Sequence, residues 1–282
     1  MINRKADFAG AWYPGNADEC EREINRFLSE KIKASTIENP VGGIVPHAGW
    51  FFSGSIACHV IHSLKKSVRP DVFVIFGMHL HPSSPSYIME DGAWETPFGE
   101  IEIETSLAKE LVSRFSFNIE TPDNYTQDNT IELQLPFIKY FFENAKILPI
   151  GVPPEKDSLK IGKAVVEIGS KLGLKINILG STDLTHYGPN YGFTPKGTGK
   201  TAHEWIRNEN DRKVIDAMIA MKPEEVITEA LSSQNACCAG AAATAIAAAK
   251  ELGAKQAQEL VYATSYDKSP GNSFVGYTGI VF

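Results

Sequence analysis

The sequence lacks the segments that would direct a protein to a membrane or to the cell exterior. No stretch approaches the ~20 consecutive apolar residues that a membrane span requires, and residues 1–7 contain no apolar core of a signal peptide. Only four cysteines occur in 282 residues and two are adjacent, which is not the pattern of a disulfide-linked scaffold. These absences predict a protein of the reducing cytoplasm that has no membrane partner.

A basic surface and an internal linker are also missing. Lys and Arg number 27 against 34 Asp and Glu, and the basic residues are dispersed, so nucleic acid is not an expected partner. No low-complexity or Pro/Ser-rich tract divides the chain. We therefore expect one domain over residues 1–282.

Apolar periodicity predicts an alternation of strands and helices. The continuous apolar runs 71–76 and 175–180 are typical of strands covered on both faces, as in a parallel sheet. Strands 260–263 and 274–282 lie too close together for a crossover helix, which favours an antiparallel pair. Further strands are expected at 41–46 and 147–150, and helices at 16–32, from 53 onward, 129–142, 157–172, 203–221, 223–231 and 236–249. The predicted fold is a three-layer α/β domain, with a mixed, mostly parallel sheet between helices on both faces.

Four distant segments place histidine, aspartate or cysteine beside Gly or Pro at the end of an apolar run. Because the carboxyl ends of parallel strands share one edge of a sheet, we expect these segments to meet in one crevice. Histidine and cysteine suit a borderline metal such as iron, zinc or copper. The candidate residues are His47, His79, His81, Asp183, His186, Cys237 and Cys238.

Each candidate also has a purely structural interpretation. His47 on its own could cap a strand, and one functional histidine among His79 and His81 is more plausible than two, although an extended chain would place both on one face. Asp183 beside His186 suits proton transfer or orientation of the imidazole ring. A helix start favours thiolate at Cys237 or Cys238, and the other sulfur is expected to be a packing group.

Three acidic segments are less specific. Glu132 could reach the crevice or bind a backbone group. The pairs Asp211-Arg212 and Glu224-Glu225 are expected on solvated helix faces.

Six motifs in this order resemble the Memo family, whose prokaryotic members are also called the AmmeMemoRadiSam system protein B. They are AGAWYPG (9–15), PHAGW (46–50), TPFGE (96–100), TIELQLPF (130–137), STDLTHYG (181–188) and Cys237 with Gly240. The chain departs from the family pattern around Gly77-Met78-His79-Leu80-His81, at Asn129, where relatives tend to carry His, and at Cys238, where Gly is usual.

The resemblance implies a fold similar to the class III extradiol dioxygenases, which bind non-heme iron through two His and a carboxylate. It implies a metal triad of His47, His81 and Cys237, catalytic roles for Asp183 and His186, and a cleft lined by His79, Glu132 and Cys238. Iron is the first expectation, with copper or zinc as alternatives. The resemblance also implies a radical-SAM partner protein.

Two classes of function follow. One is a metal-dependent oxidoreductase acting on a small molecule, although cysteine in place of a carboxylate counts against standard catechol cleavage. The other is a non-catalytic adaptor or metal-handling protein whose cleft binds a peptide or an ion; a metal- or cysteine-dependent hydrolase is a third reading. Fold analogy alone does not choose between these classes.

Overall fold

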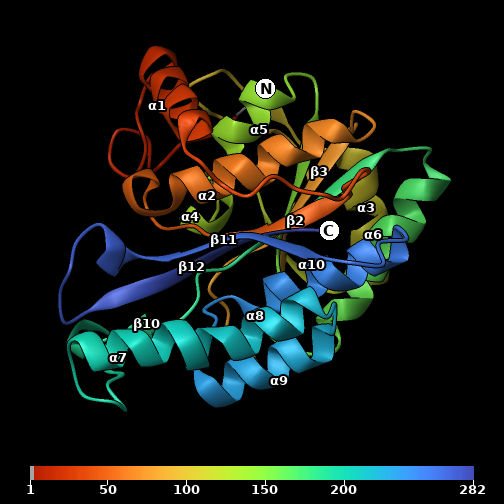
Figure 1. Cartoon of the computed structure of the whole chain (residues 1–282). Helices are drawn as coiled ribbons and strands as arrows, with labels where there is room; N and C mark the ends of the chain where they lie inside the picture. Colours follow the sequence, from red (N-terminus) through yellow and green to blue (C-terminus); the bar gives the residue numbers. More distant parts are fainter. Residues whose placement is uncertain (1–2) are drawn as a thin grey trace.

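A mixed β-sheet forms the centre of the protein, which we describe over residues 3–282 from a computed structural model (Figure 1). From one edge to the other its strands are β11 (Gln258–Thr264), β12 (Phe274–Val281), β2 (Gly42–Val45), β9 (Ile176–Ser181), β3 (Val72–Gly77), β8 (Lys146–Gly151), β4 (Ser86–Met89) and β7 (Phe117–Glu120). The short strand β10 (His186–Tyr187) pairs with the start of β12.

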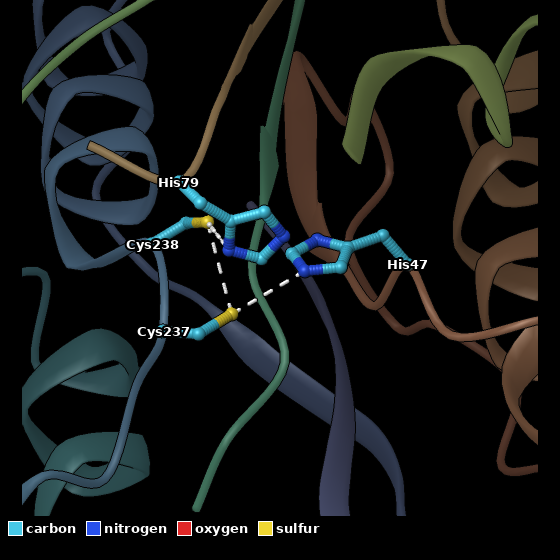
Figure 2. Close-up of side chains that lie close together, drawn as sticks. All are labelled: His47, His79, Cys237 and Cys238. Carbon is cyan, nitrogen blue, oxygen red and sulfur yellow. Dashed lines mark hydrogen bonds between the residues drawn. The ribbon is translucent and has the colours of Figure 1, made fainter. Parts of the chain in front are cut away.

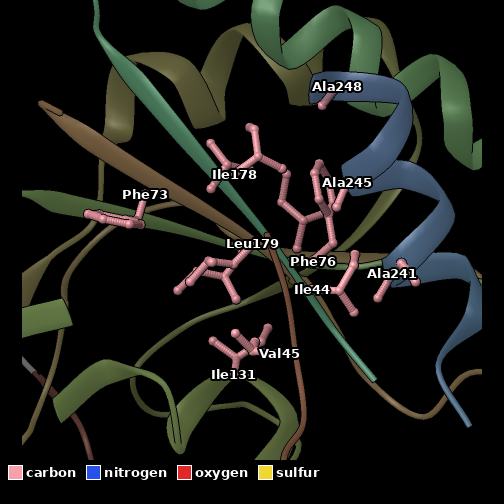
Figure 3. Packing of buried hydrophobic residues seen from close by; sticks show 14 of the residues in the cluster. Ile44, Val45, Phe73, Phe76, Ile131, Ile178, Leu179, Ala241, Ala245 and Ala248 are labelled. Carbon is pink, nitrogen blue, oxygen red and sulfur yellow. The ribbon is translucent and has the colours of Figure 1, made fainter. Parts of the chain in front are cut away.

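The four central strands, β2, β9, β3 and β8, are parallel. β3 and β9 are buried along their whole length, as their continuous apolar runs predicted. Figure 3 shows their side chains packed against apolar residues of helices on either side. Because these strands point the same way, their carboxyl ends lie at one edge of the sheet.

Antiparallel strands flank this parallel centre. β12 runs antiparallel to β2, β10 and β11, which confirms the antiparallel pairing predicted for the last two strands. On the other side, β4 runs antiparallel to β8 and parallel to β7.

Helices cover both faces of the sheet. One face carries α1 (Ala17–Ser29), α2 (Trp50–Ser63), α4 (Asn129–Glu132) and α5 (Leu135–Phe141); the other carries α3 (Thr105–Arg114), α6 (Ser158–Lys171), α8 (Asp211–Ile219), α9 (Pro223–Ser233) and α10 (Ala239–Glu251). The alanine-rich helix α10 packs so closely on β9 that a Cβ on Gly180 would lie 2.8 Å from the Cβ of Ala245. The predicted α/β fold with a mixed sheet between two helical layers is confirmed.

Two predicted helices are interrupted. The segment 129–142 divides into α4 and α5, because Pro136 has no N–H to continue the hydrogen-bond ladder. The helix predicted over residues 203–221 starts earlier, with α7 (Lys200–Trp205), and contains a π-helical segment at Ile206–Asn210 before α8. A π-helical segment contains one residue more than the α-helical turn it replaces, so the side chains that follow it point toward a different face of the helix.

The region between β3 and α4 holds elements for which no prediction was made. They include α3, β4 and β7, together with β5 (Ala93–Trp94) and β6 (Ile101–Glu102), which form a small separate sheet with β1 (Asn3–Arg4) from the start of the chain. Most of these strands are too short for their periodicity to be informative. No helix in the described part of the chain combines the length and apolar character needed to cross a membrane.

Candidate metal centre

Side chains from the ends of neighbouring parallel strands meet the start of α10. His47 follows β2 by two residues, His79 follows β3 by two residues, and Ser181 closes β9, which lies between those strands. Cys237 and Cys238 immediately precede α10. Figure 2 shows the two imidazole rings and the two sulfurs facing one another.

The donor atoms of this cluster are close enough to share one ion. One ligand atom from each of His47, His79, Cys237 and Cys238 lies within 4.8 Å of the others. The sulfur of Cys237 is 3.3 Å from Nε2 of His47 and 3.7 Å from the sulfur of Cys238, which is 3.4 Å from Nδ1 of His79. Imidazole and thiolate donors fit a borderline metal such as iron, copper or zinc.

Hydrogen bonds behind His47 determine which ring nitrogen faces the cluster. The hydroxyl of Ser181 donates to the backbone oxygen of Thr130 at 2.7 Å, so its oxygen is left to accept from Nδ1–H of His47 at 3.0 Å. Nε2 therefore points at the sulfur of Cys237. An outer hydrogen bond of this kind is what orients histidine ligands in metal sites.

Asp183 holds both the backbone and the charge of His47. One carboxylate oxygen accepts the backbone N–H of His47 at 2.8 Å, and the other lies 3.9 Å from Nε2 of His47 and 3.9 Å from Nε2 of His186. Burial lowers the pKa of His47, but the negative charges of Asp183 and Cys237 outweigh burial and raise that pKa to about 9. Burial also lowers the pKa of His186, but the Asp183 carboxylate outweighs burial, so this pKa is raised above its usual value.

The two thiols behave differently. Burial disfavours thiolate at Cys237, yet hydrogen bonding from Cys238 and the positive charge of His47 lower its pKa well below the usual value. Burial and the neighbouring Cys237 thiolate raise the pKa of Cys238 well above it. Cys237 is half-buried and Cys238 is buried. Of the two thiols, Cys237 therefore loses its proton before Cys238.

His79, rather than His81, lies in this cluster, whereas the family resemblance implies His81 as the ligand. Met78 adopts a left-handed conformation (φ 69°), and the N–H of Leu80 closes a turn on the oxygen of Met78. The chain therefore does not continue extended beyond β3. Both histidines are exposed, but the ring of His79 lies 3.4 Å from the sulfur of Cys238, whereas His81 hydrogen-bonds outside the cluster with Ser83 and Ser84.

Glu132 lies outside the cleft and binds backbone groups, which is the second of the two roles predicted for it. Its carboxylate accepts the backbone N–H groups of Asp7 and Phe8 at 3.0 and 2.8 Å and the hydroxyl of Tyr13 at 2.9 Å. Burial raises the pKa of Glu132 to about 7. It anchors the N-terminal segment, from which Trp12 reaches the pocket described next.

A pocket of about 620 Å³ opens beside the cluster. His47, His79, Asp183, His186 and Asn129 line its polar side, and Asn129 donates from its side chain to the backbone oxygen of His47 at 3.0 Å. Three further lining residues are exposed aromatics: Trp12, Phe51 and Tyr191. This volume lies within the range of small-molecule sites.

A buried polar network behind the loop 182–187 was missed, because Asp211 was expected on a solvated helix face. Asp211 is fully buried; its carboxylate accepts the backbone N–H of Thr185 at 3.1 Å and the hydroxyl of Tyr262 at 2.7 Å. Asn210, which ends the preceding π-helical segment, donates from its side chain to the hydroxyl of the same threonine, Thr185, at 3.0 Å. Burial raises the pKa of Asp211 to about 6. Asn235 joins this network to the cysteine segment by donating to the oxygen of Asn210.

Fold and cluster together define an α/β protein with a histidine–cysteine centre at the carboxyl edge of its parallel strands. The sequence matches the family of Memo-like proteins over residues 4–281, and the chain belongs to that family. It is 32% identical over 287 residues to a MEMO1 family protein of Pyrococcus furiosus, covering 99% of this chain and 98% of the relative. A MEMO1 family protein of Caldivirga maquilingensis is 32% identical over 294 residues, covering 100% of this chain and 99% of the relative. The structure is also similar to that of an uncharacterized Escherichia coli K12 protein, with a TM-score of 0.49 and 10% identity over 79% of this chain and 92% of that one.

Proposed function

We propose that this Memo-family protein holds a transition-metal ion through Nε2 of His47, Nδ1 of His79 and the sulfur of Cys237, and acts on a small molecule in the adjoining pocket. The observation that carries the proposal is the convergence of these donors within 4.8 Å of one another. Iron is the ion that the family resemblance favours, and copper or zinc also fit the donors. Iron or copper, which are redox-active, would supply electron transfer to or from the substrate.

The surrounding side chains suit proton handling next to such an ion. Nε2 of His186 is buried without a hydrogen-bond partner among the described residues, and it lies 3.9 Å from a carboxylate oxygen of Asp183. This pair can hold a proton at Nε2 and deliver it to a bound molecule, because both residues line the pocket. Asn129 offers no titratable group at the same wall, and His47 and His79 are assigned to the ion, so we assign the role of proton donor to His186.

The exposed aromatic side chains favour a second candidate, a binding protein whose pocket receives a peptide. Phe51 is 63% exposed, Tyr191 47% and Trp12 42%, and all three line the pocket. Aromatic side chains are enriched where proteins bind partners. Among the described lining residues none is Arg or Lys, so a phosphorylated peptide lacks the cation that usually grips its phosphate.

Elemental analysis tests the metal proposal. Protein purified from iron-, copper- or zinc-supplemented medium should contain up to one equivalent of metal, and the His47→Ala/His79→Ala double variant should contain almost none. Circular dichroism of both proteins controls for folding. Equal metal content in the two proteins would remove the proposed centre and leave the binding alternative.

A further inference from the structure

Cys238 brings a second sulfur to the centre, on the side opposite His47. Its sulfur lies 3.4 Å from Nδ1 of His79 and 3.7 Å from the sulfur of Cys237 (Figure 2). The backbone N–H of Cys238 donates to the hydroxyl of Thr182 at 3.1 Å, and that hydroxyl donates to the oxygen of Asp183. This thiol is therefore held at the centre by the same loop that positions Asp183.

The spacing of the donors matches four ligands around one ion. In tetrahedral sites sulfur lies about 2.3 Å and nitrogen about 2.1 Å from zinc, which places two sulfurs about 3.8 Å apart and sulfur and nitrogen about 3.6 Å apart. The observed sulfur–sulfur distance is 3.7 Å, and the sulfur–nitrogen distances are 3.3 and 3.4 Å. The remaining donor pairs lie within 4.8 Å of one another, so side-chain rotations that bring them to about 3.4–3.8 Å would complete a tetrahedron.

We propose that Cys238 is a fourth ligand, so that the centre is a Cys₂His₂ site selective for a thiophilic ion, Zn²⁺ or Cu⁺. This inference rests on the metal centre of the proposed function, to which it adds a donor, and it replaces the ion open to a small molecule by a closed one. Two thiolates make the donor set softer than the two histidines and a carboxylate that suit iron. Four protein donors also leave no open position on the ion, which is typical of sites that hold a metal rather than expose it to a substrate. The four-donor centre thus favours metal handling among the functions that the sequence suggests.

The coordination can be read directly with cobalt and zinc as probes. Metal-free protein titrated with Co²⁺ should develop the near-ultraviolet absorbance of two thiolate ligands, and Cys238→Ser and Cys238→Ala should each retain about half of it. The affinity of either variant for Zn²⁺ should fall by more than the ~10–100-fold that accompanies loss of an outer-shell partner. X-ray absorption of the zinc-loaded wild type should find two sulfur and two nitrogen neighbours. Cys58→Ala, which removes a buried thiol in α2, is the matched control and should change neither quantity.

Three outcomes separate this inference from the proposal on which it rests. Absorbance and affinity unchanged in both Cys238 variants, with one sulfur neighbour at zinc in the wild type, would reject Cys238 and leave the three-ligand centre standing. A wild type that binds neither Co²⁺ nor Zn²⁺ would reject both. Loss of about half the absorbance with two sulfur neighbours at zinc supports the four-ligand centre, and the wild-type measurement holds even where a variant folds poorly.

Discussion

The side-chain oxygen of Ser181 lies 3.0 Å from Nδ1 of His47, and its own proton is committed to the oxygen of Thr130. His47 therefore keeps its proton on Nδ1 and presents Nε2 to the sulfur of Cys237. A serine at the end of β9 thus decides which atom of a histidine at the end of β2 is available as a ligand.

Replacing Ser181 by alanine should weaken metal binding without unfolding the protein. The ring of His47 would lose the acceptor that orients it, and outer-shell losses of this kind reduce metal affinity by ~10–100-fold. Ser55→Ala is a matched control, because Ser55 is also buried and its hydroxyl donates to Glu30 rather than to a residue of the cluster. Chelator competition measures the affinity; equal affinity in the two variants would contradict the role of Ser181.

Single substitutions at His79 and His81 should have opposite outcomes. His79→Ala removes a donor of the cluster and should abolish stoichiometric binding of metal. His81→Ala removes only an exposed ring outside the cluster, whose Nδ1 lies 3.3 Å from the hydroxyl of Ser83, so its metal content should equal that of the wild type. Elemental analysis of both variants gives the answer, and retention of metal by His79→Ala together with its loss from His81→Ala would restore the triad of the family resemblance.

The difference between these histidines marks the limit of what the sequence predicts. Convergence at one sheet edge follows from buried apolar runs, because such runs form parallel strands whose ends coincide. The left-handed conformation of Met78 leaves no trace in the residue pattern, and at the turn that includes it His79, not His81, lies beside the sulfur of Cys238. The buried residue Asp211 likewise follows a π-helical segment, which apolar periodicity does not predict.

Cys237 should be alkylated faster than the other cysteines in metal-free protein. Burial raises the pKa of both Cys20 and Cys58 to about 12, whereas that of Cys237 lies well below the usual value. Because thiolate is the reactive form, Cys237 should react faster than Cys20 and Cys58 at neutral pH, and its rate should rise less steeply with pH than theirs. Peptide mapping after brief treatment with iodoacetamide identifies the site. Preferential labelling of Cys238 would reverse the assignment of thiolate and thiol.

The last prediction concerns Glu132 and the pH dependence of stability. Burial raises the pKa of Glu132 from its ordinary value of 4.5 to about 7. Between these values the folded protein binds the proton more tightly than the unfolded chain, so this group lowers the free energy of unfolding as pH rises.

The variant Glu132→Gln has no carboxyl at this position, so its free energy of unfolding does not depend on pH through this group. At pH 5 the variant should be less stable by ~1–3 kcal/mol, because an amide N–H₂ would face the N–H of Asp7. The difference should narrow by pH 8, where only the wild type must ionise a buried carboxyl. Chemical denaturation at the two pH values measures both quantities, with exposed Glu143→Gln as the control. A difference that widens with pH would mean that the ionised carboxylate stabilises the anchored N-terminal segment.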